Sequence, residues 1–376
     1  MKTIVSLLNN SGFHSVNDLI RYFQNKQPKK YFYRPIGIEV EITNRCNLKC
    51  LGCNIMMDEL NKPNDLLSAQ EFNNILTECN KLGMFGYSIT GGEPFLKFNT
   101  ILEIIKFNHG LDLYKLNTNG SFFRSIKITQ QYLSELKSVG LGKRNKYIKP
   151  VIVISLGQQN FAGVPIQNTV NLTSQIYNFF SGDEISCCLN LTDANPLLVK
   201  KIYADFLKSY YKITGKKFSE NRFEVRFFSL NTVETLRRLS LISGPERPMI
   251  ERIRDFKTEY LSQGCFNINV QNTIYQKRAE TLIPRCVLRP NGDLYACQGF
   301  SRVHLLGNLI DTPLNLILDQ ANRDLTLRTV FTNNLTGLYR LALKKNRRKT
   351  YETLVGKQYS PCDICQMLTG FIKFKN

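Results

Sequence analysis

The chain has 376 residues, of which 43% are hydrophobic, and carries 50 Lys and Arg against 30 Asp and Glu, a formal net charge of +20 at pH 7. This length suits about two domains or one large barrel with an appendage, the apolar fraction argues against global disorder, and the charge either keeps the chain soluble or attracts an acidic partner. The sequence contains no run of about 18 apolar residues, so a membrane span is not expected. The first ten residues are too weakly apolar for a secretory signal, and a cytoplasmic protein is therefore expected.

In chain order, the pattern begins with an amphipathic helix predicted over 16–24, followed by short apolar runs that alternate with helical patterns as far as residue 230. Strands are predicted over 36–42, 86–90, 113–117, 150–156, 185–192 and 223–228. Helices are predicted over 68–82, with Ser68 as N-cap, and over 100–108, 129–139, 169–180 and 196–211. This alternation predicts an α/β fold with a parallel sheet. Six repeats fit a curved or partial barrel better than a closed eight-fold one, and chemistry in such folds lies at the carboxyl ends of the strands.

The pattern changes after residue 230. A charged connector with a helix over 248–261 is followed by a predicted hairpin, in which 287–288 and 294–295 flank a tight turn at 290–293. A further helix is predicted over 314–327. The basic run 341–349 is most often a solvated face, although it could steer an acidic peptide or a nucleic acid. The expected divisions are an N-terminal segment 1–35, a barrel 36–235, a connector 236–280 and a small C-terminal domain 281–376.

Three of the eleven cysteines form a C-x3-C-x2-C motif directly after the first predicted strand: Cys46, Cys50 and Cys53. Without a secretion signal, metal binding or catalysis is a better interpretation of these cysteines than disulfides. Iron–sulfur clusters are usually held by four cysteines, so three close ligands leave one iron open for catalysis. Structural zinc is the alternative, but it needs a fourth ligand, and the only imidazoles in the chain are those of His14, His109 and His304.

A second motif, Gly91-Gly92-Glu93-Pro94, ends the second predicted strand. Glycines after a strand let a ligand approach the backbone closely. The Glu93 carboxylate can accept a hydrogen bond from an ammonium group. Alone, this tetrapeptide is a common turn, but its place one strand–helix unit after the three cysteines makes the combination specific.

Over about 36–230 the sequence resembles the radical S-adenosylmethionine (SAM) enzymes. The matching residues are Cys46, Cys50 and Cys53 with the adjoining segment 42–47, and the glycine motif 91–94. The end of the third strand, 117–120, and the fourth strand, 153–156, also match. The resemblance implies a partial (β/α)6 barrel of the TIM type and a [4Fe-4S] cluster whose open iron chelates SAM. It also implies that Gly91, Gly92 and Glu93 hold the methionine end of SAM. Ser155, Asn119 and Asn190 would face the cofactor. Gly52 departs from the family, which usually has an aromatic residue before the third cysteine.

Four further cysteines lie in the C-terminal region: Cys286 and Cys297, which flank the predicted hairpin, and Cys362 and Cys365, which form a C-x2-C pair. Four thiolates suit a fully ligated [4Fe-4S] cluster and tetrahedral zinc about equally. The arrangement resembles the auxiliary-cluster extensions called SPASM and Twitch domains, and implies one auxiliary [4Fe-4S] cluster. The full SPASM pattern needs seven cysteines and none follows Cys365, so the shorter Twitch type fits better.

The remaining cysteines are Cys79, Cys187, Cys188 and Cys265. Cys79, on a predicted helix, is expected in the core. Cys187 and Cys188 are adjacent on the fifth predicted strand, so one of them should point inward. Cys188 and Cys265 are the candidate catalytic thiols, with Cys265 able to offer a hydrogen atom to a substrate radical. A structural role is the more common one for each.

The resemblance implies reductive cleavage of SAM to a 5′-deoxyadenosyl radical that abstracts hydrogen from a substrate. A ribosomally made peptide undergoing oxidative cross-linking or epimerisation is the first expectation for that substrate. The alternatives are dehydrogenation or epimerisation of a small molecule such as an aminosugar, and an RNA-modifying or RNA-binding iron–sulfur protein, although no RNA-binding module is recognisable. A non-catalytic electron carrier would leave the three-ligand cluster beside the glycine motif unexplained. A reductant such as flavodoxin or ferredoxin is the expected partner, with no membrane and no nucleic acid.

Overall fold

The computed structural model describes residues 13, 16–29, 31–48, 65–143, 145–156, 164–193, 196–219, 223–229, 285–296, 304–329, 341 and 344. Several predicted features lie outside the described residues: the helix over 248–261, most of the basic run, Cys50, Cys53, Cys265, Cys297, Cys362 and Cys365.

In the described part of the chain, nine strands form one sheet with the order β6-β5-β4-β3-β2-β1-β7-β8-β9. Its strands are β1 Gly37–Glu41, β2 Gly86–Thr90, β3 Asp112–Thr118, β4 Val151–Leu156, β5 Ser186–Asp193, β6 Phe223–Ser229, β7 Arg285–Leu288, β8 Asp293–Tyr295 and β9 Leu305–Asn308. The strands from β1 to β6 pair in parallel with their neighbours in the chain. This confirms the predicted α/β fold and the curved, partial barrel.

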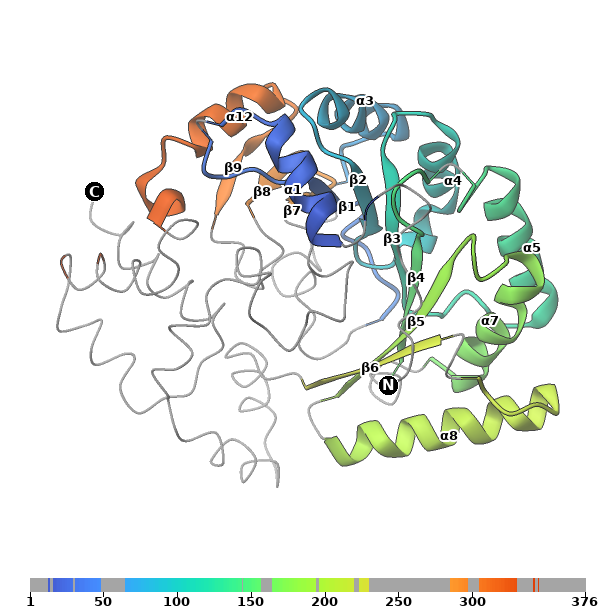
Figure 1. Ribbon diagram of the computed structural model, residues 1–376. Helices are drawn as coiled ribbons and strands as arrows, with labels where there is room; N and C mark the ends of the chain where they lie inside the picture. Colours follow the sequence, from blue (N-terminus) through green and yellow to red (C-terminus); the bar gives the residue numbers. More distant parts are fainter. Residues whose placement is uncertain are drawn as a thin grey trace.

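Helices follow the parallel strands and lie on the outer side of the curved sheet (Figure 1). They are α3 Ala69–Lys81, η1 Pro94–Lys97, α4 Phe98–Lys106, α5 Ile126–Ser138, α7 Ile166–Phe179 and α8 Pro196–Thr214. Ser68 begins α3 as predicted, because its hydroxyl accepts the Glu71 N–H while the Glu71 carboxylate accepts the Ser68 N–H, a capping box. The five predicted barrel helices are all present, each with ends within a few residues of those expected.

Two hydrophobic cores hold the sheet. The larger lies between the sheet and the outer helices, and includes Ile38, Leu76 and Cys79. The smaller packs Leu19 and Phe23 of α1 (Val16–Lys26) against residues that include Cys188 of the inner face. Because α1 packs against Ile36 and Phe85, which precede β1 and β2, it covers the amino ends of the strands and leaves their carboxyl ends to the site.

The predicted hairpin is present as β7 and β8, which pair antiparallel across a turn in which Gly292 has a φ of +87°. β7 also pairs in parallel with β1, so the hairpin continues the barrel sheet. The turn is joined to the barrel again, because Leu66 N and Leu67 N both donate to the Pro290 carbonyl, at 2.9 Å.

Two features near the end of the described chain differ from expectation. Strand β9 was not predicted, and the helix expected over 314–327 ends as α12, Leu314–Ala321. The side chain of Asn322 donates to the Leu318 carbonyl at 2.8 Å and accepts the Tyr33 N–H at 2.9 Å. A local side-chain bond of this kind competes with the helical ladder and ends the helix.

No helix in the described ranges combines the length and the hydropathy that a membrane span requires.

Candidate functional site

The site lies where β1, β2 and β3 end, at one edge of the sheet. After β1 the chain runs through Thr43 and Arg45 to Cys46, and there it pairs with the glycine motif that follows β2. Gly92 N donates to the Thr43 carbonyl at 2.7 Å, and Glu93 N donates to the Arg45 carbonyl at 2.9 Å. The two sequence motifs are therefore in direct backbone contact.

This contact explains why the motif contains two glycines. A Cβ on Gly91 would lie 2.5 Å from the Thr43 oxygen, and one on Gly92 would lie 2.0 Å from the Arg45 oxygen. Gly91 also has a φ of +144°, which other residues rarely adopt. The close approach predicted for a ligand is made here by the chain's own cysteine loop.

A carboxylate that sequence reasoning missed holds the same loop. Asp65 accepts the Thr43 hydroxyl at 2.7 Å and the Asn44 N–H at 3.0 Å, and the Thr43 hydroxyl oxygen in turn accepts the Arg45 N–H at 3.0 Å. Arg45 and Lys97 lie 4.0 and 3.6 Å from the Asp65 carboxylate. No motif marks Asp65 in the sequence, because it acts only once the fold brings it beside residue 43.

Cys46 is half-buried, and its sulfur faces two N–H donors. Leu48 N lies 3.4 Å from Sγ, and Asn119 Nδ2 lies 3.7 Å from it. Donors of this kind favour a thiolate, which is the form that ligates iron. The surroundings of Cys46 therefore fit an iron–sulfur ligand.

Glu93 lies beneath the loop with an exposure of 0%. One carboxylate oxygen accepts Phe95 N at 3.1 Å and the Thr118 hydroxyl at 2.9 Å, and the other accepts Asn119 N at 2.7 Å. Burial raises the pKa of Glu93 to about 7, although these donors oppose the rise. The contacts with Thr118 and Asn119 join the glycine motif to the end of β3, and the predicted contact of Glu93 with an ammonium group stays a prediction.

The other predicted cofactor residues come from β4 and β5. Ser155 pairs in register with Asn190, and Ser155 is exposed while Asn190 is half-buried. Cys188 is completely buried and donates its S–H to Asn190 Oδ1 at 3.7 Å. It packs in the inner core whereas Cys187 packs in the outer one, which confirms that one of the two thiols points inward.

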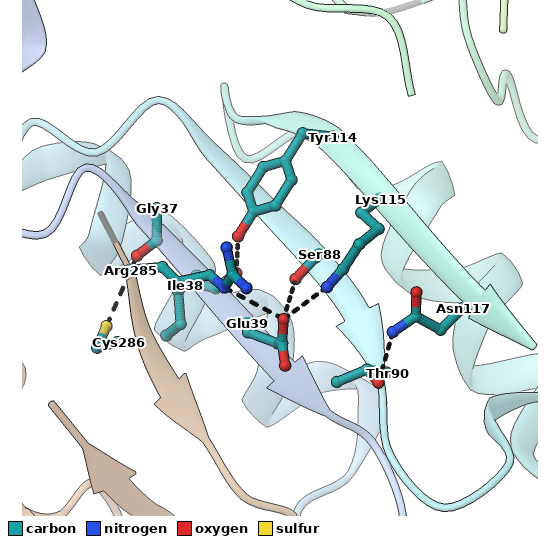
Figure 2. A network of polar contacts seen from close by, with 10 residues as sticks. All are labelled: Gly37, Ile38, Glu39, Ser88, Thr90, Tyr114, Lys115, Asn117, Arg285 and Cys286. Carbon is teal, nitrogen blue, oxygen red and sulfur yellow. Dashed lines mark hydrogen bonds and ion pairs between the residues drawn. The ribbon is translucent and has the colours of Figure 1, made fainter. Parts of the chain in front are cut away.

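The inner face below the site carries buried charges (Figure 2). The Glu39 carboxylate on β1 lies 2.8 Å from Lys115 Nζ on β3 and 3.3 Å from Arg285 Nε on β7, and it accepts the Ser88 hydroxyl at 3.3 Å. Desolvation would raise the pKa of Glu39, but the two cations outweigh it and hold this pKa below its usual value. Next on the same face, Glu41 lies 3.6 Å from Arg289. The part of the inner face around Glu39 and Glu41 is therefore polar and cross-linked by ion pairs.

Cys286, a predicted auxiliary-cluster ligand, lies on β7 opposite Ile38 of β1. Its side chain is fully buried in the outer core that also holds Cys79, and its S–H donates to the Gly37 carbonyl at 3.8 Å. Burial raises the pKa of Cys286 to about 12. Within the described ranges, no three metal-ligating side chains come together.

The chain was compared with known proteins. Residues 40–142 match a family model described as a 4Fe-4S single cluster domain. A GTP 3′,8-cyclase of Desulforamulus reducens is 32% identical over 111 residues, which are 29% of this chain and 32% of that protein. A PqqA peptide cyclase of Bradyrhizobium diazoefficiens is 31% identical over 107 residues, 28% of this chain and 27% of that protein.

The chain therefore spans about a third of the length of these curated relatives. Among solved structures, Streptococcus suis SuiB bound to S-adenosylmethionine matches with a TM-score of 0.46 and 19% identity, covering 78% of this chain and 67% of that one. The family-model match, 40–142, includes most of β1 and all of β2 and β3, together with the loops that form the site.

Proposed function

We propose that the chain is a radical SAM enzyme, which uses a [4Fe-4S] cluster on Cys46, Cys50 and Cys53 to cleave SAM reductively. The observation that carries the proposal is the backbone pairing of the cysteine loop with the glycine motif at the ends of β1 and β2. When bound, the cluster and SAM would supply the radical chemistry that abstracts a hydrogen atom from the substrate.

The described residues have separate roles in this proposal. Cys46 would ligate iron, and Glu93 and Asp65 hold the two loops on either side of it. Ser155 and Asn190 are neighbours on β4 and β5, and would contact the cofactor from the opposite side of the site. The polar groups aligned there would orient the cofactor against the substrate and exclude water.

The test is anaerobic. Reconstituted protein is mixed with dithionite and SAM and assayed for 5′-deoxyadenosine, with Cys50→Ala as the control. We expect product from the wild-type protein and none from the variant. A fully loaded wild-type protein that yields no product, alone or with candidate substrates, would contradict the proposal.

We propose a peptide as the substrate, modified by oxidative cross-linking or epimerisation. The support is the similarity to a PqqA peptide cyclase and the net charge of +20, which suits an acidic peptide. Radical-dependent change in the mass or stereochemistry of a candidate precursor peptide would test this.

A small-molecule substrate is the second candidate, because the chain is also similar to the GTP 3′,8-cyclase of Desulforamulus reducens, at 32% identity over 111 residues. The two candidates differ in what stimulates SAM cleavage. Stimulation by a nucleotide or an aminosugar, with no response to peptides, would favour the second. A flavodoxin or ferredoxin would replace dithionite as the reductant in either case.

We further propose that the C-terminal region, 281–376, holds one auxiliary [4Fe-4S] cluster on Cys286, Cys297, Cys362 and Cys365. The support is the spacing of the four thiols and the hairpin between the first two. Its test is the iron content of the anaerobically reconstituted protein.

A further inference from the structure

Three polar residues, Asn47, Asn119 and Ser121, form a closed set of hydrogen bonds beside Cys46 through their side chains and the Ser121 N–H. Asn119 Nδ2 donates to Asn47 Oδ1 at 3.0 Å, and Asn47 Nδ2 donates to the Ser121 hydroxyl at 2.8 Å. The circle is completed by Ser121 N, which donates to Asn119 Oδ1 at 2.9 Å. Each amide thus has a donor and an acceptor partner of the correct kind.

This circle determines which end of the Asn119 amide faces the sulfur. The two ends of an amide are distinguished only by their hydrogen-bond partners. A backbone N–H can only donate, so the atom facing Ser121 N must be the oxygen. The NH₂ group therefore points toward Asn47 and toward Cys46 Sγ, 3.7 Å away.

The backbone of Asn119 is held as firmly as its side chain. Its N–H donates to the buried Glu93 carboxylate at 2.7 Å, and the preceding Thr118 hydroxyl donates to the other oxygen of that carboxylate. These two bonds join the glycine motif to the end of β3 at Asn119, the residue whose amide faces the Cys46 sulfur. An amide held at both ends has little freedom to turn away from Cys46.

We propose that Asn119 is a positioning residue for the iron–sulfur cluster, whose side-chain N–H raises the reduction potential of the cluster through the Cys46 sulfur. This inference rests on the proposed function, because it requires the cluster on Cys46. Hydrogen bonds to ligating sulfurs stabilise the more negative, reduced cluster and so set its potential. Asn119 acts on the cluster here, and the earlier expectation that it faces SAM is not needed for this role.

The test is a redox titration of the reconstituted protein, followed by electron paramagnetic resonance without SAM. Asn119→Leu removes the N–H donor at nearly constant size and charge. We expect the variant to keep about four irons at this site. At a fixed potential its ratio of reduced to oxidised cluster should fall about tenfold, equivalent to about 59 mV for a one-electron couple.

The matched control is Asn117→Leu, the same change two residues earlier on the same strand. The Asn117 amide donates to the Thr90 hydroxyl at 2.9 Å, so this variant should leave the midpoint unchanged. If Asn119→Leu loses iron, Asn119→Asp provides the second test, since it keeps the oxygen that accepts Ser121 N. Asn117→Asp then controls for the added charge.

The outcomes separate the two proposals. A wild-type protein that binds no cluster contradicts the proposed function. A loaded Asn119→Leu protein with an unchanged midpoint overturns only the role of Asn119. The same holds if the Leu and Asp variants both lose the cluster, because a donor that tunes the potential is not needed to retain iron.

Discussion

The buried side chain of Glu93 holds its proton to a higher pH than an exposed glutamate does, because its pKa is raised. Its pKa is raised from 4.5 to about 7 by desolvation, which three hydrogen-bond donors only partly offset. An acid with a raised pKa in the folded state stabilises the fold fully below pH 4.5. It loses that contribution as the pH rises through about 7.

We therefore expect the free energy of unfolding of the wild type, relative to Glu93→Gln, to fall by about 3 kcal/mol between pH 4.5 and pH 8. Urea unfolding of both proteins at a series of pH values measures this difference. Glu78→Gln is the control, because the Glu78 side chain is 54% exposed. The free energy of unfolding of the wild type relative to this variant should change little over the same pH range. A flat difference for Glu93→Gln would show that the carboxylate is ionised throughout.

Glu39 presents the opposite case, a buried carboxylate kept ionised by two cations. Lys115→Met leaves it with Arg285 as the cation in Figure 2, so part of its charge is uncompensated. We expect a loss of about 3 kcal/mol in the free energy of unfolding. Lys81→Met breaks a pair of nearly equal length, 2.7 Å to Glu78, but at the surface, and should cost less than about 0.5 kcal/mol. Equal effects in denaturant titrations would contradict this interpretation.

At the scale of elements, the cysteine loop and the glycine motif form one unit. Gly92→Ala must displace the Arg45 carbonyl, which would lie 2.0 Å from the new Cβ. We expect the variant to lose up to about four irons per chain, the content of the first cluster, while the thermal stability changes little. Gly182→Ala is the matched control, since nothing lies within 4 Å of its Cβ. Full iron in Gly92→Ala would mean that the pairing of the two loops is not required for the cluster.

The barrel elements were predictable because their signals are local. Alternating apolar runs, the cap at Ser68 and the turn at Gly292 each depend on a few neighbouring residues. The pairing of β7 with β1 was not predictable, because it joins Gly37 to Arg285 across a long stretch of chain. Strand β9 was missed because Leu305–Asn308 is too short for a recognisable period.

The residues of the site that belong to short sequence motifs were predictable as well. Cys46, the glycine motif and Asn119 belong to motifs, and the structure brings these three together. Asp65, Asn47 and Ser121 were missed because their role depends on contacts across 21 to 74 residues. The hydrogen bonds that Glu93 accepts from Phe95 and Thr118 were not predicted from the sequence, and its expected contact with SAM stays a prediction.

At the scale of the whole molecule, the two cysteine groups make a stoichiometric prediction. Two four-iron clusters require about eight irons per chain. The double variant Cys362→Ser/Cys365→Ser should reduce this to about four and leave the SAM-dependent signal of the first cluster. Anaerobic iron and sulfide analysis with electron paramagnetic resonance measures both. About four irons in the wild-type protein would contradict the auxiliary cluster, in agreement with the burial of Cys286.

The parallel pairing of β7 with β1 also has a consequence for how the protein is made. Synthesis on the ribosome proceeds from the N-terminus, so all six strands of the barrel emerge before Arg285 does. Until then one edge of β1 is unpaired, Glu39 lacks one of its cations, and Leu66 and Leu67 lack their acceptor on Pro290. Leu66 and Leu67 directly follow Asp65, which accepts hydrogen bonds from Thr43 and Asn44 before Cys46. The segment that holds the Cys46 loop, the edge of β1 and the buried charge of Glu39 are therefore completed only after residue 290, once most of the chain has been made.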